Sequence, residues 1–187
     1  GSMGATATYA FAVYEDARPV AAYSWQPPPA GAAKNTCVEA PGGVLALSRM
    51  VAVPRAERRL KHVSKPLRKQ MKSLIDRGRW PVLITYSDEG QGHTGYVYQC
   101  SGWEKTTKRE ARFFLNSDGK RASSYSNGKS GGRDLVFGGR TNLQRWEHWI
   151  CPRGDALRWM EEHGWRRVAV PGKVWRSGNQ AFKWVQA

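Results

Sequence analysis

Three side chains that can transfer or orient protons lie close together in residues 86–103. Asp88 and His93 belong to a glycine-rich segment, and Tyr98 follows on what the sequence predicts to be a short helix. An aspartate can take a proton from an attacking amine or orient that amine, and a tyrosine can return a proton to a leaving group. The run before them, residues 80–86, is rich in β-branched and aromatic residues and predicts a buried strand. Because ligands collect at the carboxyl ends of strands in α/β folds, we expect the active site here.

Each of these side chains also has a purely structural interpretation. Asp88 can cap the turn that follows it, and Tyr98 can be a core residue of its helix. For His93 we favour a loop histidine that hydrogen-bonds the backbone. Cys100 has no partner base at a fixed spacing, so we do not expect a cysteine nucleophile. The spacing of the three cysteines does not fit a metal site, and free thiols of a reducing cell interior are expected for Cys37, Cys100 and Cys151.

The charge of the chain restricts the kind of partner. Its 187 residues include 30 Lys and Arg but only 15 Asp and Glu, a net charge of +15. This excess favours a polyanionic partner, above all nucleic acid, and the partner that we expect is double-stranded DNA; the alternative is a basic housekeeping domain. The nine tryptophans suit contact with bases as well as a core. No apolar run has the length of a membrane span and no secretory signal is present, so we expect a cytoplasmic protein with no membrane partner.

The first half of the chain predicts a hairpin, a strand and an amphipathic helix. Residues 9–14 and 19–25 alternate around a turn and predict the hairpin, and residues 26–43, rich in Pro, Gly and Ala, are expected to be a loop. Residues 44–53 predict a strand that Pro54 ends. A helix is expected at residues 64–77, with Ser64 as its N-cap and Gly78 at its end. Its basic face is either solvated or turned toward DNA or phosphate.

The second half is more basic and less regular. Residues 105–115 predict a strand, and residues 116–140 a long basic loop that either contacts sugar-phosphate or is simply flexible. A short helix is expected at residues 155–163, followed by a strand at 165–170 and basic-aromatic strand pieces at 173–176 and 182–185. We expect a single domain over residues 1–187, in which residues 1–3 are a tag remnant and residues 141–187 a basic, tryptophan-rich C-terminal part.

This order of elements resembles the GNAT acyltransferases. The resemblance rests on Val53-Pro54 with the following residues 59–64, in the place of that family's phosphate-binding loop, and on residues 98–103, which match its Tyr-x-x-x-Gly-aromatic helix ending. It implies an α+β fold, sandwich-like, with helices flanking a central mixed, mostly antiparallel, splayed sheet and a basic C-terminal extension. It also implies binding of acetyl-CoA or another acyl-CoA, whose pyrophosphate suits a helix N-terminus. His62 and Ser64 depart from the two small residues of the family's loop.

A narrower resemblance, to the Mom branch of this superfamily, covers roughly residues 44–103. It rests on Leu47-Ser48-Arg49, on Tyr86-Ser87-Asp88 with Gly92-His93-Thr94-Gly95, and on Tyr98-Gln99. Mom proteins are phage and prophage proteins that add a carbamoylmethyl group to adenine N6 in DNA and so protect it from restriction. An iron site with a His-Tyr pair on an early strand is associated with the family. Here Ala22 precedes Tyr23, so the sequence lacks that pair and a metal requirement is doubtful.

The resemblance implies a role for each matching residue. Asp88 and Tyr98, ten positions apart as in the family, would be catalytic together with Ser48, where a backbone N–H can stabilise an oxyanion. The implied acyl-CoA contacts are Met50, Val51, Val53, Arg58, Arg59, Lys61, His62, Val63 and Ser64. The implied contacts to substrate or DNA are Arg49, Tyr86, His93, Lys120, Arg121, Lys129, Arg133 and Arg140. The alternative for Ser48 and Arg49 is a buried polar pair.

Three functions are compatible with these residues. The first is a phage-type, Mom-like enzyme that uses acyl-CoA to modify an amine in DNA, either adenine N6 or an amine on a hypermodified base. The second is an N-acetyltransferase of a small amine or a protein, for which the positive surface would be incidental. The third is a non-catalytic DNA-binding protein. Salt-dependent DNA binding argues against the second, and acyl-CoA binding argues against the third.

Overall fold

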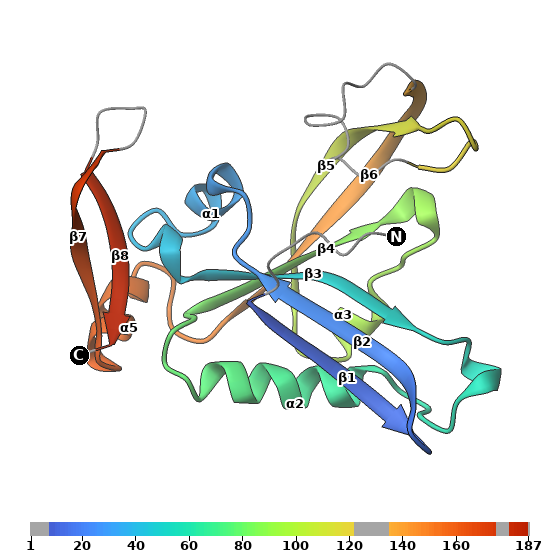
Figure 1. Cartoon of the computed structure of the whole chain (residues 1–187), viewed down its shortest axis with the longest axis horizontal. Coiled ribbons are helices and arrows are strands. Elements are labelled where there is room, and N and C mark those ends of the chain that lie inside the picture. Colours follow the sequence, from blue (N-terminus) through green and yellow to red (C-terminus); the bar gives the residue numbers. More distant parts are fainter. Residues whose placement is uncertain (1–7, 122–134, 175–179, 187) are drawn as a thin grey trace.

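The protein is built on one mixed six-stranded sheet and a separate C-terminal hairpin (Figure 1). The computed structural model describes residues 8–121, 135–174 and 180–186. The sheet has the strand order β1-β2-β3-β4-β6-β5, and β7 pairs only with β8. The strands are β1 (Tyr9–Glu15), β2 (Arg18–Gln26), β3 (Val44–Ala52), β4 (Val82–Asp88), β5 (Glu104–Leu115), β6 (Val136–Trp149), β7 (Trp165–Val174) and β8 (Gln180–Gln186).

The sheet opens between its two central strands. β3 and β4 are parallel and pair only at Val44–Val82, Leu45–Leu83 and Ala46–Ile84, whereas the other neighbouring pairs of the sheet are antiparallel. Beyond Ala46, β3 stays paired with β2 as far as Ala52, and β4 stays paired with β6 as far as Asp88. The two strands therefore separate toward their carboxyl ends. This confirms the α+β class and the mixed, mostly antiparallel, splayed sheet predicted from the sequence.

Helices cover both faces of the sheet (Figure 1). They are α1 (Ala30–Thr36), α2 (Ser64–Ile75), α3 (Tyr96–Gln99) and α5 (Ala156–Glu162), with short 3-10 turns η1 (Pro41–Gly43), η2 (Arg55–Glu57) and η3 (Glu89–Gln91). On one face α2 buries Leu67, Met71 and Leu74 against Leu45, Leu47 and Leu83 of the central strands. This spacing of apolar residues is the one predicted for an amphipathic helix. Among the described helices, none is long and apolar enough to span a bilayer.

A second core fills the opposite face. It joins Val82 and Ile84 of β4 to Ala33 of α1 and to Ala156 and Met160 of α5. Because successive residues of a strand point to opposite faces, Leu83 belongs to the first core while Val82 and Ile84 belong to the second. We call the two sides of the sheet the α2 face and the α1 face.

The structure corrects several sequence predictions. Residues 26–43 are not a continuous loop, because α1 and η1 lie within them, and Ala33 and Cys37 are buried. The predicted loop at 116–140 is shorter: Asn116 caps a tight turn that returns to Arg121, and β6 begins at Val136. Residues 122–134 lie outside the described part of the chain. The N-cap of α2 is Val63 and makes no side-chain capping bond, so Ser64 is the first helical residue rather than the cap.

Candidate functional site

The closed end of the opening between β3 and β4 is marked by a hydrogen-bonded threonine. Thr85 is the first residue of β4 beyond the parallel ladder, and its Oγ1 donates to the Leu47 carbonyl of β3 at 2.9 Å. Thr85 is buried, and its hydroxyl lies close enough to the Tyr98 side chain of α3 to influence the pKa of that phenol. The phenol predicted to be catalytic thus reaches the point where the two strands begin to separate.

Tyr98 is held among tryptophans. Its ring centroid lies 5.9 Å from those of Trp103 and Trp146, and the residue is 8% exposed. Burial raises the pKa of Tyr98 above its ordinary value, and the nearby Thr85 hydroxyl offsets part of that rise. Because the short helix begins at Gly95 with φ of +74° and a Cβ there would meet the Trp146 ring, the close approach requires glycine. The phenol is therefore positioned and kept protonated.

A β-bulge lies on the other side of the opening. Trp25 of β2 pairs with Leu47 and Ser24 pairs with Arg49, so Ser48 is an extra residue on β3. Bulges re-aim a strand and are frequent next to active sites. The Ser48 hydroxyl donates to the Ser24 carbonyl at 2.9 Å, and Ser48 and Arg49 are exposed, which differs from the buried polar pair considered as an alternative. Among the predicted acyl-CoA contacts on this strand, Met50 is half-buried and Val51 is exposed.

Asp88 caps the turn after β4 and is engaged by three donors. Its Oδ1 accepts from the Gly90 N–H at 3.0 Å and from the Thr141 hydroxyl, and its Oδ2 is paired with Arg121 at 2.5 Å. The Asp88 and Arg121 side chains are 20% and 22% exposed. A carboxylate can accept about four hydrogen bonds. One acceptor position of Asp88, on Oδ2, therefore remains free among the described contacts.

Strand alternation places Asp88 and Tyr98 on opposite faces of the sheet. Thr85 pairs with Trp146 across β4 and β6, and both contact Tyr98 on the α2 face. Asp88 is three residues beyond Thr85 and therefore points to the α1 face, where Thr141 of β6 meets it. The structure thus brings both residues to the carboxyl end of β4 but does not bring their side chains into contact.

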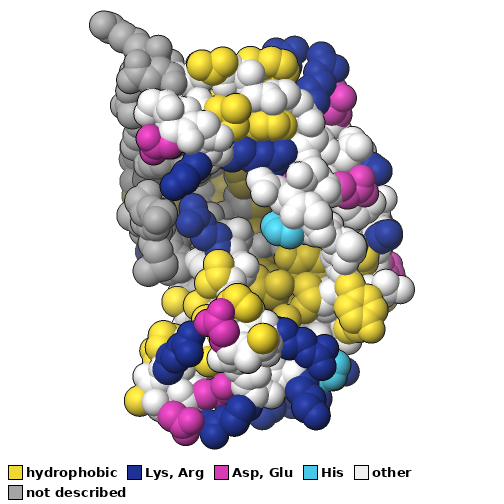
Figure 2. Space-filling view, turned by 90° about the vertical axis from the view of Figure 1, so that its right-hand side faces the viewer, with side chains coloured by type: hydrophobic (Ala, Val, Ile, Leu, Met, Phe, Trp, Pro, Cys, Tyr) yellow, Lys and Arg dark blue, Asp and Glu magenta, His cyan; other side chains and the backbone are white. Residues whose placement is uncertain are grey.

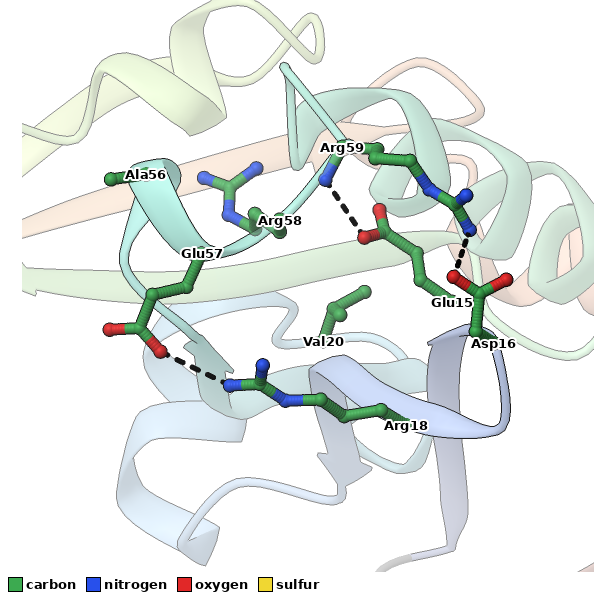
Figure 3. Close-up of a pocket in the computed structure, with 8 residues that line it drawn as sticks. All are labelled: Glu15, Asp16, Arg18, Val20, Ala56, Glu57, Arg58 and Arg59. Atoms are coloured by element: carbon green, nitrogen blue, oxygen red, sulfur yellow. Dashed lines mark hydrogen bonds and ion pairs between the residues drawn. The ribbon is translucent and has the colours of Figure 1, made fainter.

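The loop before α2 is organised by Glu15 (Figure 3). This carboxylate, at the end of β1, accepts from the backbone N–H groups of Arg59 at 2.8 Å and Leu60 at 2.6 Å. The Arg58 side chain folds back onto its own loop, where it donates to the carbonyls of Val53 at 3.0 Å and of Leu60. Arg59 pairs with Asp16 at 2.9 Å. Both arginines predicted to bind coenzyme phosphates are thus engaged within the protein.

The next N–H groups along this loop have no partners. Within the described residues, the backbone N–H groups of Lys61, His62, Val63 and Ser64 make no hydrogen bond. They precede or begin α2, where the helix dipole is positive. The Lys61 and His62 side chains are exposed, and Tyr23 fixes the loop by donating to the Val63 carbonyl at 2.9 Å. Four successive free N–H groups beside a lysine fit a pyrophosphate.

Figure 2 views the side of the molecule on which these parts meet. It shows hydrophobic side chains gathered in a hollow, with Lys and Arg side chains above and below it. This side corresponds to the right of Figure 1, where the end of β4 with η3 lies above and the end of β3 with η2 lies below. A hollow with an apolar floor and basic rims suits a chain-like ligand that ends in phosphates.

The predicted DNA contacts are distributed unevenly. Arg49, His93 and Lys120 are exposed, and the His93 N–H donates to the Asp88 carbonyl at 3.1 Å. Tyr86 is half-buried beneath Arg109, whose guanidinium carbon is 5.5 Å from the ring centroid. Arg140 pairs with Glu110 at 2.7 Å on the surface. Arg121 instead pairs with Asp88 and stacks on Phe113 at 3.7 Å. Lys129 and Arg133 lie outside the described residues.

Sequence reasoning missed three residues of the site. Glu15 lies in a hairpin turn, where an acidic residue normally indicates only solubility. Thr141 lies in β6, which had not been predicted as a strand. Thr85 was assigned to a strand, but the hydrogen bond from its hydroxyl to the Leu47 carbonyl depends on how β3 separates from β4. That separation produces no pattern in the local sequence. The described residues include no cluster of three or more His, Cys, Asp or Glu that could hold a metal ion.

Comparison with solved structures finds N-acetyltransferases. A ribosomal-protein-alanine N-acetyltransferase from Brucella melitensis is similar over 75% of this chain and 68% of its own, with 15% identity and a TM-score of 0.46. An N-acetyltransferase from Staphylococcus aureus Mu50 is similar over 76% of this chain and 67% of its own, with 10% identity and a TM-score of 0.45. A polyamine N-acetyltransferase from Drosophila melanogaster is similar over 75% of this chain and 74% of its own, with 12% identity and a TM-score of 0.42.

Comparison with sequences is more specific. No curated protein matches this chain significantly. The model of the Mom protein family, however, matches residues 1–144, which is well over half of the chain and includes β1 to β5, α1 to α3 and most of β6. The matched segment contains Ser48, Asp88 and Tyr98, and it extends far beyond the residues 44–103 on which the resemblance was first based. The chain therefore belongs to the Mom protein family.

Proposed function

We propose that this protein is an acyltransferase that uses acyl-CoA to modify an amine of a nucleobase in DNA. The observation that carries the proposal is the opening between β3 and β4, which has the Tyr98 hydroxyl at its closed end and the four free N–H groups of residues 61–64 on the loop that leaves β3. Family membership and a net charge of +15 support DNA as the acceptor. Acetyl-CoA or another acyl-CoA would supply an activated thioester carbonyl.

The donor site follows the path from α2 to the opening. The N–H groups of residues 61–64 and the Lys61 side chain would bind the pyrophosphate, because both the helix dipole and the lysine favour an anion there. Met50 and Val51 on β3, and Val53 just after it, would line the pantetheine arm. We assign Arg58 and Arg59 to shaping the loop rather than to direct phosphate contact, since each is already engaged.

Two groups would act on the transferred acyl group. The bulge at Ser48 leaves β3 backbone without a partner on the β4 side, so an N–H there can stabilise negative charge that develops on the carbonyl oxygen. Tyr98 would give its proton to the departing thiolate sulfur, and Thr85 would fix the direction of that hydroxyl. Burial favours this role because it keeps the phenol protonated.

Asp88 would act on the incoming amine. The free acceptor position on Oδ2 can take a hydrogen bond from the amine and orient its lone pair toward the carbonyl, or accept its proton. An exocyclic adenine amine is a poor nucleophile, so orientation contributes strongly to its reaction. Tyr86 and Arg109, on the same face, are placed to stack on or contact the base.

The DNA would lie across the basic surface around this face. Arg49, His93, Lys120, Lys129, Arg133 and Arg140 remain the proposed contacts to DNA, whereas Arg121 is already engaged by Asp88. In its biological setting the protein would act in the cytoplasm of a bacterial host, encoded by a phage or prophage, and would protect the modified DNA from restriction. No metal is required by the residues to which we assign chemistry.

Two binding measurements test the proposal against its alternatives. We expect the purified protein to bind coenzyme A in calorimetry and to bind duplex DNA with a steep dependence on salt, because the DNA contacts are largely to phosphates. Binding of coenzyme A without DNA binding would favour an N-acetyltransferase of a small amine or protein. Binding of DNA without coenzyme A would favour a non-catalytic DNA-binding protein.

A further inference from the structure

The C-terminal hairpin is an addition to the part of the chain that matches the family. The family match ends at residue 144, whereas β7 and β8 form a two-stranded sheet of their own at residues 165–186. They pair from Trp165–Gln186 to Val174–Gln180, with a register shift between Ala169 and Val174. An isolated two-stranded hairpin is only marginally stable in water. Something must therefore hold this one in place.

A half-buried arginine anchors the base of the hairpin to the body. The Arg79 guanidinium lies 4.5, 5.1 and 5.3 Å from the ring centroids of Trp80, Trp165 and Trp184, of which the last two belong to β7 and β8. Burial lowers the pKa of Arg79 to about 10, which still leaves it charged at neutral pH. Trp184 also packs so closely on Gly42 that a Cβ there would meet its ring. Two cation–π contacts to the hairpin, together with the packing of Trp184 on Gly42, thus fix the hairpin at one end.

The described charged side chains of the hairpin are exposed, and all of them are basic. Residues 164–187 contain five basic residues and no acidic one: Arg166, Arg167, Lys173, Arg176 and Lys183. The side chains of Arg166, Arg167 and Lys183 are exposed in the structure. Val168 and Phe182 are exposed as well, at 41% and 44%. A solvated surface with no partner normally mixes both signs of charge. The uniform sign here favours a polyanion.

The hairpin also lies on the side of the sheet from which we propose that DNA approaches. In Figure 1 the β7–β8 hairpin and the distal part of the β5–β6 hairpin both extend to the side that carries α1, while α2 lies on the other side. Asp88, Tyr86 and Arg109 face the α1 side. A rod-like ligand that reaches Asp88 from this side can therefore also meet the β7–β8 hairpin.

We propose that the β7–β8 hairpin is a second contact for duplex DNA and holds the duplex on the α1 side of the sheet. This inference rests on the proposed function, because it takes DNA to be the acceptor. Arg166 and Lys183, which share one face of the ribbon, contact the sugar-phosphate backbone, which binds without regard to sequence, whereas Arg167 on the other face stacks on Phe182 at 4.3 Å. A two-stranded ribbon also has the width that the major groove admits. The Arg79 anchor gives the ribbon a fixed position relative to the catalytic end of β4.

The test compares two triple variants of equal charge. The hairpin variant carries Arg166→Gln, Arg167→Gln and Lys183→Gln; the control carries Lys65→Gln, Arg68→Gln and Lys69→Gln, three exposed positions of α2 on the opposite face. All six side chains are exposed, and thermal unfolding verifies that both proteins are folded. The affinity for a mixed-sequence duplex is measured by fluorescence anisotropy over a series of salt concentrations. Each lost phosphate contact lowers the slope of log affinity against log salt by about 0.9.

We expect the hairpin variant to lose about two units of slope, from Arg166 and Lys183, and to bind duplex at least tenfold more weakly than the control near physiological salt. The control should keep nearly the slope of the unmodified protein. Equal losses in the two variants, or a larger loss in the α2 variant, would overturn the inference and leave the proposed function standing. An unmodified protein that binds coenzyme A but no duplex would overturn the proposed function, and this inference with it.

Discussion

The Asp88 carboxylate and the Tyr98 hydroxyl lie on opposite faces of the sheet, both near the end of β4 that borders the opening between β3 and β4. Tyr98 reaches the opening through Thr85 on the α2 face, and Asp88 points to the α1 face toward Thr141. In the proposed reaction an amine arrives at the acyl carbon and a thiolate leaves it. Two residues on opposite faces of the sheet can serve these two events separately, without direct contact between them.

Replacing Tyr98 with phenylalanine should slow catalysis and leave the fold intact. The ring keeps its packing against Trp103 and Trp146, and only the hydroxyl near Thr85 is lost. We expect kcat to fall by about 100-fold or more, as for other general acids, and the affinity for coenzyme A to change less than about threefold. Steady-state kinetics and calorimetry measure the two quantities. An unchanged kcat would remove Tyr98 from the chemistry and make it a core residue.

Two substitutions of Asp88 separate its structural role from its proposed catalytic role. Asp88→Asn keeps an oxygen that accepts from Gly90 but loses the charge that pairs with Arg121, so activity should fall at least tenfold with little change in stability. Asp88→Ala also removes the cap of η3 and should lower the free energy of unfolding by about 1 kcal/mol. Urea denaturation and DNA modification assays measure these effects. Full activity in Asp88→Asn would show that Asp88 serves only as a cap.

Glu15 should control the affinity for the acyl donor. Glu15→Ala removes the acceptor of the Arg59 and Leu60 N–H groups and frees the loop that presents residues 61–64. We expect the Kd for coenzyme A to rise about tenfold, because the loop must then become ordered when the ligand binds, which costs conformational entropy. The control is Glu57→Ala, which removes an equal charge from the same pocket but only an exposed pair with Arg18. Equal effects of the two variants would contradict the role of Glu15.

Alkaline pH should destabilise the protein through Tyr23. Burial raises the pKa of Tyr23 from 10 to about 12, opposed by the nearby charge of Arg58. A group whose pKa is raised by folding contributes its stability in full below its unfolded-state pKa, and loses it as the pH rises toward the folded-state pKa. We expect roughly 2 kcal/mol of stability to be lost between about pH 10 and 12. Urea denaturation of Tyr23→Phe should show a shallower decline; an identical decline would contradict this assignment.

The helices and strands whose apolar residues recur with a clear period were predictable from the sequence. The hairpin of β1 and β2, the strands β3 and β4, the amphipathic α2 and the helix α5 all lie where alternation or helical spacing placed them. The position of Tyr98 on a short helix after a glycine-rich turn was also predicted correctly. These features depend on neighbours in the sequence, so a local pattern is sufficient to find them.

β6 was missed because charged residues are buried in it, which contradicts the usual alternation of buried apolar and exposed polar residues along a strand. Arg145 and Glu147 are buried in a strand, and they form an ion pair at 2.8 Å with 9% and 6% side-chain exposure. Glu147 also accepts from Trp149 Nε1 at 2.8 Å and from Arg153 at 2.9 Å, so its charge is balanced by partners within six residues of it. Buried charges of this kind break the alternation of apolar and polar residues. Since Thr141 lies on the same strand, the environment of Asp88 was hidden as well.

Local sequence patterns likewise could not show which basic residues are free to bind phosphate. A cluster of Arg58, Arg59 and Lys61 before a helix indicates an anion site, and only the folded loop shows that Glu15 and Asp16 from a hairpin some 40 residues earlier engage part of it. The same holds for Arg121, which composition assigns to DNA and the structure pairs with Asp88. Long-range electrostatic pairing decides which basic residues are available to a ligand.

The modification of DNA in living cells tests the central claim most directly. The protein is expressed in bacteria, the host DNA is digested to nucleosides, and their masses are measured for the unmodified protein, for Tyr98→Phe and for an empty vector. We predict a new, heavier nucleoside with the unmodified protein that is absent from the vector control and strongly reduced with Tyr98→Phe. Only ordinary nucleosides from cells that contain folded protein able to bind coenzyme A would contradict the claim that it transfers an acyl group to a base of this DNA.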